Sequence, residues 1–250
     1  MTASRHKLNT GLFFLLMLLL LNTSCRKKPD IIVLTEGSMT AEEVFALVEG
    51  AMSVKTEGMM RELLTAIAIH TEQLTAGNPN PHCNISDRNL KSDVFDRDRY
   101  QGTFSVNRQW ILNCDDQEIP DQLIYSWEGD ITYQAPKLSS RDYTDGNLAL
   151  TYEELHDDWH LNGTYERTGR QISKILQKQT YETTLFLNFK NLVVEPQRME
   201  SRHGSATFEI SGSTVGGRTF FFSGEIEFPD NGATEVTLGS RTYPFYPFRQ

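Results

Sequence analysis

The sequence predicts a mainly β fold: an antiparallel meander of about seven to nine strands, curled as a half-barrel or a sandwich and packed by an N-terminal α-helical segment. Three observations support this prediction. From Tyr100 onward apolar residues recur with a period of two, glycine-containing pairs separate the runs, and no helical pattern follows residue 80. Parallel strands need long crossover connections, so we expect hairpin-connected neighbours in one β domain over 100–250.

The strand prediction rests on runs in which apolar and polar side chains alternate. The clearest runs cover 159–166, 184–190, 206–211 and 217–228, with Phe186 as an exception on the polar side. One apolar side and one polar side are typical of antiparallel sheets that bury a single face. We therefore expect each strand to place one face in the core.

Turn chemistry separates several of these runs. Pairs that accept positive φ favour tight hairpins, and we expect them at Asp145-Gly146, Gly216-Gly217 and Asn231-Gly232. Glycines inside strands mark bends or bulges, and three lie in the predicted strands: Gly163, Gly212 and Gly224.

Residues 40–77 form the one strong helical prediction. Thr40 followed by Glu43 has the form of a capping box, so the helix should begin there. Gly50 and Gly58 weaken the interior, which predicts a break near 53–58 and two shorter helices. The apolar stripe along this segment either packs against the sheet or binds a partner or lipid, and core packing is the commoner role.

The first 24 residues have the order of a secretion signal. A basic start precedes an apolar run over 11–21, which is too short to span a membrane. The ending Ser24-Cys25 resembles a lipobox, in which the cysteine receives the lipid, although Asn22 stands where an aliphatic residue is usual. We expect 1–24 to be removed as a lipoprotein signal peptide; the alternative is an ordinary cleaved signal with an incidental cysteine.

Residues 25–39 would then form a lipidated N-terminus and tether. The basic residues directly after Cys25, at 26–28, are attracted to anionic headgroups or serve as a soluble spacer. Secretion and lipidation together predict a protein of the bacterial cell envelope, anchored to a membrane through its lipid. The lipobox-like ending resembles those of Bacteroidota lipoproteins, whose surface-exposed members are expected to carry acidic residues directly after the cysteine. The lack of such residues after Cys25 implies, by this resemblance, an outer-membrane protein that faces the periplasm.

The charge balance excludes one class of partner. The formal net charge is −9, and removal of Arg5 and Lys7 with the signal leaves 22 basic and 33 acidic residues, a net charge of −11. A surface this acidic repels phosphate backbones, so we expect no nucleic-acid partner.

Two cysteines remain after Cys25. Cys83, in a predicted linker over 78–99, and Cys114 would enter an oxidising compartment, so we expect them to form a disulfide. A metal pair or a reactive thiol is the alternative. Neither cysteine belongs to a Cys-x-x-Cys motif, and His82 alone supplies too few ligands for zinc.

The densest group of potential metal ligands lies at 153–160. His156, Asp158 and His160 would share one face of a strand and could present two imidazoles and a carboxylate to a divalent ion. A solvated acidic hairpin explains the segment equally well, so these residues are weak candidates. We assign no metal, no cofactor and no catalytic residue.

Two further hypotheses are a ligand-binding cavity lined by aromatic residues and a hydrolase active site. Six aromatic residues could line a lipid or glycan cavity or could pack the core: Trp127, Tyr133, Trp159, Tyr165, Phe208 and Phe222. A hydrolase would need a pair of carboxylates at a defined separation, which a sequence cannot measure.

The whole pattern resembles a family of uncharacterised Bacteroidota envelope lipoproteins. The matching features are Cys25, the helical segment, the two cysteines at 83 and 114, and the β segments at 161–169, 180–194 and 205–212. The resemblance implies an envelope location and a β fold but no activity. We therefore expect a non-enzymatic binding or structural domain with a lipid or envelope protein as ligand; the alternative is an envelope hydrolase.

Overall fold

The chain divides into two units, 1–31 and 32–250, and all of the described residues belong to the second. The structure, a computed structural model, describes residues 39–75, 83–117, 119–151, 158–175, 178–195, 198, 200–230 and 232–249. The predicted signal peptide, Cys25 and the tether up to residue 38 lie outside these residues, as does His156.

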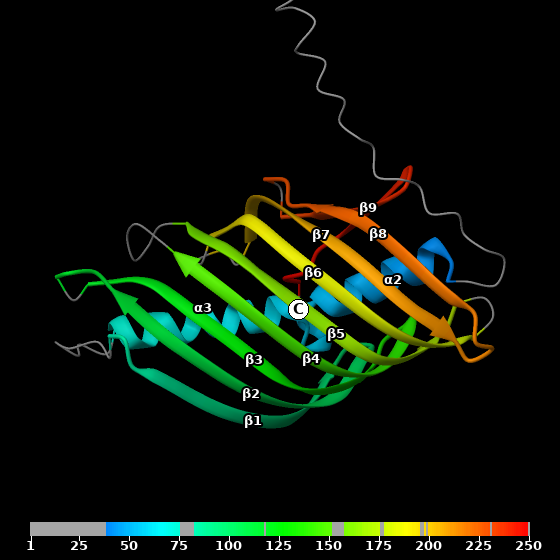
Figure 1. Cartoon of the computed structure of the whole chain (residues 1–250), viewed down its shortest axis with the longest axis horizontal. Coiled ribbons are helices and arrows are strands. Elements are labelled where there is room, and N and C mark those ends of the chain that lie inside the picture. The colour runs from blue at the N-terminus through cyan, green and yellow to red at the C-terminus, as the bar shows by residue number, and fades with distance from the viewer. Residues whose placement is uncertain are drawn as a thin grey trace, which may run out of the picture. The chain divides into compact units, whose positions relative to one another are not determined.

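The described residues form one sheet of ten antiparallel strands, in which every strand pairs with its neighbours in sequence (Figure 1). In chain order the strands are β1 (Ser86–Arg97), β2 (Tyr100–Cys114), β3 (Pro120–Gln134), β4 (Leu138–Thr151), β5 (Trp159–Ser173), β6 (Thr180–Glu195), β7 (Glu200–Thr214), β8 (Thr219–Glu227), β9 (Thr234–Leu238) and β10 (Arg241–Phe245). The sheet is curled but not closed, and β1 and β10 are its two edges. The predicted mainly β meander is confirmed.

The helical segment consists of α2 (Ala41–Met52), a 3-10 turn η1 (Val54–Thr56) and α3 (Met59–Thr75). The capping box is present: the Glu43 amide donates to Thr40 Oγ1 at 3.3 Å, and the Thr40 amide donates to Glu43 Oε2 at 2.8 Å. The break is also present, because Glu57 adopts a positive φ of 52°. A Cβ at Gly58 would lie 2.4 Å from the Ala51 carbonyl oxygen, so the chain needs glycine there.

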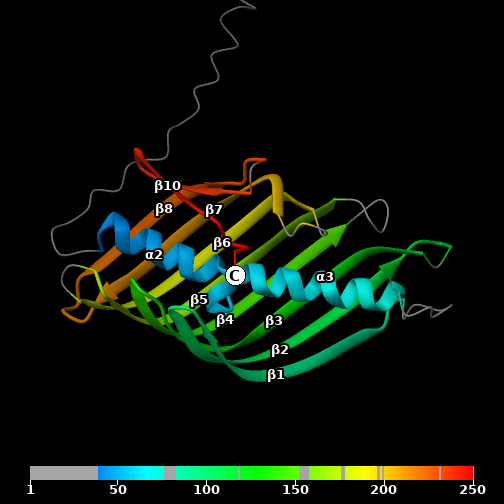
Figure 2. The same cartoon turned by 180° about the vertical axis from the view of Figure 1, so that it is seen from behind.

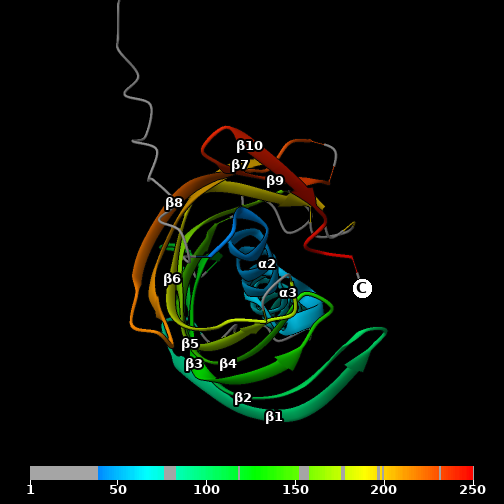
Figure 3. The same cartoon turned by 90° about the vertical axis from the view of Figure 1, so that its right-hand side faces the viewer.

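The two helices lie across the concave face of the sheet (Figure 2), and the strands wrap around them (Figure 3). The apolar stripe of the helices is buried against the sheet. Its members are at most 8 % exposed and belong to one core with the inward strand residues: Phe45, Val48, Met52, Met59, Leu63 and Ile67. The stripe is core packing.

Residues 86–97 differ from the prediction, because part of the expected 78–99 linker is strand β1. Every residue from Ser86 to Val94 is exposed, so neither side of this strand carries the apolar alternation that marks a half-buried strand. The strand exists because it pairs along its whole length with β2. The alternation of apolar and polar residues was missing from this part of the sequence because neither face of the strand is buried from Ser86 to Val94.

The predicted hairpin at Asp145-Gly146 is also wrong. Both residues lie inside β4, where Gly146 sits against Trp127 of β3. A Cβ at Gly146 would lie 2.2 Å from the Trp127 ring, so this glycine makes room for an indole and does not turn the chain. The expected turn at Gly216-Gly217 is confirmed between β7 and β8, with a φ of 81° at Gly217.

The remaining expected glycines have two different roles. Gly163 stands at a register shift between β5 and β6, as a bulge requires. Gly212 and Gly224 lie at regular positions, where a Cβ would come within 2.9 Å of the Phe220 ring and within 2.4 Å of the Phe208 ring. These two glycines provide space for aromatic side chains. Gly232, with a φ of 71°, lies in the connection from β8 to β9, while Asn231 is outside the described residues.

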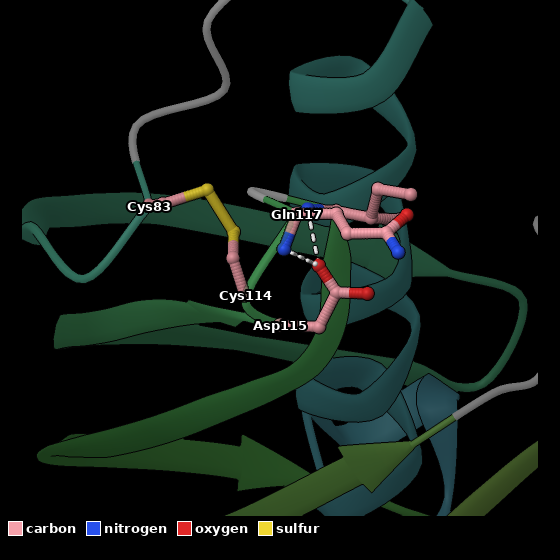
Figure 4. Close-up of a disulfide and its surroundings, with 5 residues drawn as sticks. Cys83, Cys114, Asp115 and Gln117 are labelled. Atoms are coloured by element: carbon pink, nitrogen blue, oxygen red, sulfur yellow. Dashed lines mark hydrogen bonds between the residues drawn. A yellow bond between two sulfur atoms is a disulfide. The ribbon is translucent and has the colours of Figure 1, made fainter.

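The predicted disulfide between Cys83 and Cys114 is present, with Cα atoms 5.6 Å apart (Figure 4). It joins the chain just before β1 to the end of β2. The turn after Cys114 is ordered by Asp115, whose Oδ1 accepts hydrogen bonds from the amides of Gln117 at 2.8 Å and Ile119 at 2.9 Å. Among the described residues, none of the helices has the length and apolarity needed to cross a membrane.

Candidate functional site

The six aromatic residues that could have lined a cavity are all core residues. Each is at most 3 % exposed, and each contacts the cluster that includes the helices: Trp127, Tyr133, Trp159, Tyr165, Phe208 and Phe222. The Trp127 and Tyr165 rings, for example, stack with centroids 5.7 Å apart. The helices therefore occupy the side of the sheet on which these aromatic rings lie.

The weak metal candidates are not brought together by the described structure. Asp158 and His160 are both exposed at the start of β5, and His156 lies outside the described residues. Within the described ranges no three His, Cys, Asp or Glu side chains form a group that could hold a metal ion.

A hydrogen-bonded polar network crosses β4, β5 and β6 on the concave side. Asp142 accepts hydrogen bonds from the Ser140 hydroxyl at 2.5 Å and from the Gln171 amide at 2.6 Å. The Gln171 side-chain oxygen accepts from the Thr183 hydroxyl at 2.7 Å. All four side chains are buried, so the network links three strands inside the core.

Arg167 connects this network to α2. Its Nε lies 3.5 Å from Asp142 Oδ2, and its Nη1 donates to the Gly50 carbonyl oxygen at 2.9 Å. The guanidinium also lies over the Tyr133 and Tyr165 rings, 5.4 and 5.9 Å from their centroids. Burial raises the pKa of Asp142, against the opposing charge of Arg167 and the two hydrogen bonds it accepts. The contacts orient the helix above the sheet.

A second buried ion pair holds α3. Glu62 forms a bidentate pair with Arg108 of β2, with Nε–Oε2 at 2.7 Å and Nη2–Oε1 at 2.6 Å. The Tyr125 hydroxyl of β3 donates to the same carboxylate at 2.6 Å. Burial and the Glu62 charge raise the pKa of Tyr125, so its phenol stays a hydrogen-bond donor. The carboxylate accepts all three of these hydrogen bonds from two side chains and is not placed to act as a general base.

His70 of α3 is fully buried against Trp159. The two rings pack edge to face with centroids 4.7 Å apart and an interplanar angle of 87°. Burial lowers the pKa of His70 to about 4, so the imidazole is neutral at neutral pH. A neutral histidine in this position serves the packing of α3 on the sheet.

A cleft of about 270 Å³ opens where the C-terminal part of α2 meets the turns after β1 and β3. Three elements contribute to its wall: the helical segment, the start of β2 and the β3–β4 connection. The lining residues are Ala46, Glu49, Gly50, Ser53, Thr56, Arg99, Tyr100, Tyr133, Ala135, Pro136, Lys137 and Leu138. Gly50 is part of the cleft wall, and its carbonyl oxygen accepts the hydrogen bond from the buried Arg167, so the cleft adjoins that contact.

The charged groups around this cleft are mostly cationic. Lys137 Nζ lies 3.5 Å from Glu49 Oε2, the one carboxylate of the lining. The Arg99 side chain is 74 % exposed at the rim, and its Nε lies 3.8 Å from Asp98 Oδ2. Lys55 Nζ lies over the Tyr100 ring, 5.4 Å from its centroid. Burial, followed by the negative charge of Glu49, raises the pKa of Tyr100, which keeps its phenol protonated. The cleft can therefore offer cations and a hydroxyl donor to an anionic group.

Of the cleft residues, Tyr133 was named from the sequence as an aromatic residue that could line a cavity, and Gly50 as a glycine that weakens the helix. None of the others was singled out as a site residue, and neither were the buried pairs. For Asp142 and Arg167 a signal existed, since both fall on the inward parity of their strands, where a charged residue needs a buried partner. For the cleft no signal existed, because its lining comes from chain segments that only the curl of the sheet brings together.

The Glu62–Arg108 pair yields a stability prediction. Arg108→Met leaves the Glu62 carboxylate buried without its cation and should lower the free energy of unfolding by about 3 to 5 kcal/mol, measured by urea denaturation. Replacing the whole group, with Glu62→Met, Arg108→Met and Tyr125→Phe together, should recover most of this loss. The exposed Arg170, which contacts Glu182 at 3.8 Å, is the control, and Arg170→Met should have little effect. A large loss in the triple variant would contradict this account.

His70 yields a pH prediction. Its pKa is about 4 in the folded chain and about 6.5 when unfolded, so between these values only the unfolded chain binds the proton. Stability should therefore fall as the pH falls from 7 toward 4, by about 2 kcal/mol at pH 5 from this residue. Thermal melts of the wild type and His70→Gln at several pH values measure it. Equal pH dependence in the two proteins would rule out His70 as the cause.

Comparison with known proteins adds no family: no protein-family model, no curated protein and no solved structure matches this chain.

Proposed function

We propose that the chain is a lipid-anchored protein of the bacterial cell envelope that binds an anionic envelope component through the cleft beside α2 and catalyses no reaction. Cys25 fastens it to the outer membrane on the periplasmic side. The single observation that carries the binding role is a cleft with cations around it in a chain whose net charge is −9.

The distribution of charge supports an anionic ligand. Lys137 is partly neutralised by Glu49, and the exposed Arg99 at the rim lies 3.8 Å from the exposed Asp98 carboxylate, whereas Lys55 lies close to the same opening and makes no ion pair among the described residues. Cations in a cleft with low-dielectric walls attract anions more strongly than the same cations on an open surface. The Tyr100 and Ser53 hydroxyls can complete the binding of a phosphate by hydrogen bonds, whereas the buried Thr56 hydroxyl already donates to the Gly50 carbonyl oxygen.

The anchor favours the phosphate of a lipid headgroup as the ligand. Residues 25–39 form the tether, and a chain of this length reaches at most about 54 Å when fully extended. The β domain therefore remains within reach of the headgroups of the membrane that holds it. At that short range a weak site is sufficient, because the tether keeps the local headgroup concentration high.

The rival function, hydrolysis by a pair of carboxylates, lacks comparable support. The lining of the cleft contains one carboxylate, Glu49, and it is paired with Lys137. The buried carboxylates Glu62 and Asp142 belong to internal networks that hold the helices and strands together. A glycosidase needs two carboxylates facing one substrate, which makes binding the better-supported function.

The anchor predicts a change of compartment. In the producing bacterium the wild type should fractionate with membranes, and Cys25→Ala should leave them, because the acyl groups have no attachment site. Mass spectrometry of the N-terminal peptide should find acylated Cys25 in the wild type. A full-length chain found in the cytosol with its first 24 residues attached would overturn the proposal.

The cleft predicts a loss of headgroup binding. In a Cys25→Ser background, which removes the lipid, the protein should co-sediment with phosphatidylglycerol vesicles more than with phosphatidylcholine vesicles. Arg99→Gln with Lys137→Gln should weaken this binding about tenfold, since each cation near an anionic surface contributes roughly 1 kcal/mol. Arg141→Gln with Arg170→Gln removes the same charge from exposed positions of β4 and β5 and is the control. Equal losses in both pairs would refute a role for the cleft.

A further inference from the structure

The outer edge of β1 pairs with no described strand. β1 stands at the end of the strand order, and its free edge faces away from the helices and the rest of the sheet (Figures 1 and 3). It is 12 residues long, and Leu90 and Val94 are 69 % and 73 % exposed. A long free edge presents unpaired amide and carbonyl groups to which another strand can add.

The register with β2 assigns each β1 side chain to a face. Lys91 lies opposite Val106 and Asp93 opposite Phe104, and both β2 residues are buried on the concave side. Odd-numbered residues of β1 therefore project to the concave side. Even-numbered residues, including Leu90 and Val94, project to the convex side.

The sequence of β1 is complementary to itself in one antiparallel register. When Ser92 lies opposite Ser92 of a second copy, each charged residue of the strand lies opposite a residue of opposite charge. The two exposed apolar residues lie opposite each other. By two-fold symmetry each pair occurs twice, and the pairs are Lys91 with Asp93, Arg88 with Asp96, Asp87 with Arg97, and Leu90 with Val94. Arg97 also pairs with Glu57 of its own copy, so the Asp87 pair shares this cation and the other pairs carry the register.

Neighbouring symmetric registers lack this complementarity. An axis at Lys91 or at Asp93 places each of these residues opposite its own copy, with like charge facing like charge. An axis at Leu90 places Asp87 opposite Asp93, and an axis at Val94 places Lys91 opposite Arg97. Like charges directly opposite each other destabilise a strand pair, whereas opposite charges and apolar pairs stabilise it.

We propose that two copies of this chain associate through their β1 edges, antiparallel, with the two-fold axis at Ser92, and form one continuous sheet. A two-fold interface uses the same surface on both copies, and the β1 sequence meets that condition. Lys91 and Asp93 make no ion pair among the described residues, so both charges are available to the second copy.

Cysteine cross-linking tests the position of the axis. Residues directly opposite in an antiparallel pair have Cα atoms about 4.5 to 5.5 Å apart, within the reach of a disulfide. The full chain carrying Ser92→Cys, treated with a mild oxidant, should therefore give a reducible covalent dimer on non-reducing gels. Ser105→Cys is the matched control, because Ser105 is exposed on the same face, opposite Ser92 on β2. Its copies would lie about 15 Å apart, three strand spacings, and should not cross-link.

A charge-swap series tests the register without relying on a covalent bond. Sedimentation velocity of the full chain in mild detergent should show a dimer for the wild type. Lys91→Asp should raise the dissociation constant on the order of tenfold, because two attractive pairs become two repulsive ones. Adding Asp93→Lys to Lys91→Asp restores opposite charges across the axis and should restore the dimer. Both residues are exposed and face apolar neighbours on β2, so the swap leaves the fold intact.

Each possible result of these two experiments either supports the β1 dimer or overturns it. Cross-linking at position 92 alone, together with rescue by the double swap, supports the β1 dimer. A monomeric wild type, equal cross-linking at 92 and 105, or a double swap no better than Lys91→Asp each overturns it.

Discussion

The structure depends on one constraint, the covering of the concave face of an open sheet. Ten strands curl without closing, so their inward apolar side chains would face water unless another element filled the trough. The two helices fill it. Apolar packing is not directional, and polar contacts spaced along the helical segment set its position. In chain order these contacts are Glu43 with Tyr181, the Gly50 carbonyl with Arg167, Glu57 with Arg97, and Glu62 with Arg108.

These contacts also decide where the protein can act. Since the helices occupy the concave side and the aromatic rings pack beneath them, binding on this side has to use the rim of the trough, and the edges of the sheet remain accessible. The rim supplies the cleft, where the turn at Arg99 and the connection at Lys137 approach the end of α2. The edge supplies β1, whose outer side pairs with no described strand and whose Lys91 and Asp93 make no ion pair among the described residues. Gly50 and Tyr133 belong to both the interior and the recognition surface, because they contact Arg167 and also line the cleft.

The sequence predicted those parts of the fold that leave a periodic signal. Strands with one buried face were recognised by alternation, and the broken helix by its cap and glycines. β1 was missed because neither of its sides is buried, and Gly146 was misread because a glycine that admits the Trp127 ring looks like one that turns the chain. The cleft could not be predicted at all, since its lining comes from separate segments whose proximity depends on the curl of the sheet.

The two proposed surfaces can be separated on geometric grounds. Arg99 lies just beyond one end of β1, and antiparallel pairing about Ser92 puts the two Arg99 residues at opposite ends of the joined strands. With 14 residue steps between them, they would be roughly 45 Å apart. No ligand as small as a headgroup can bridge that distance, so each cleft has to bind its own. Headgroup binding therefore does not require the dimer, and a variant that disrupts β1 pairing should leave the affinity of each cleft unchanged.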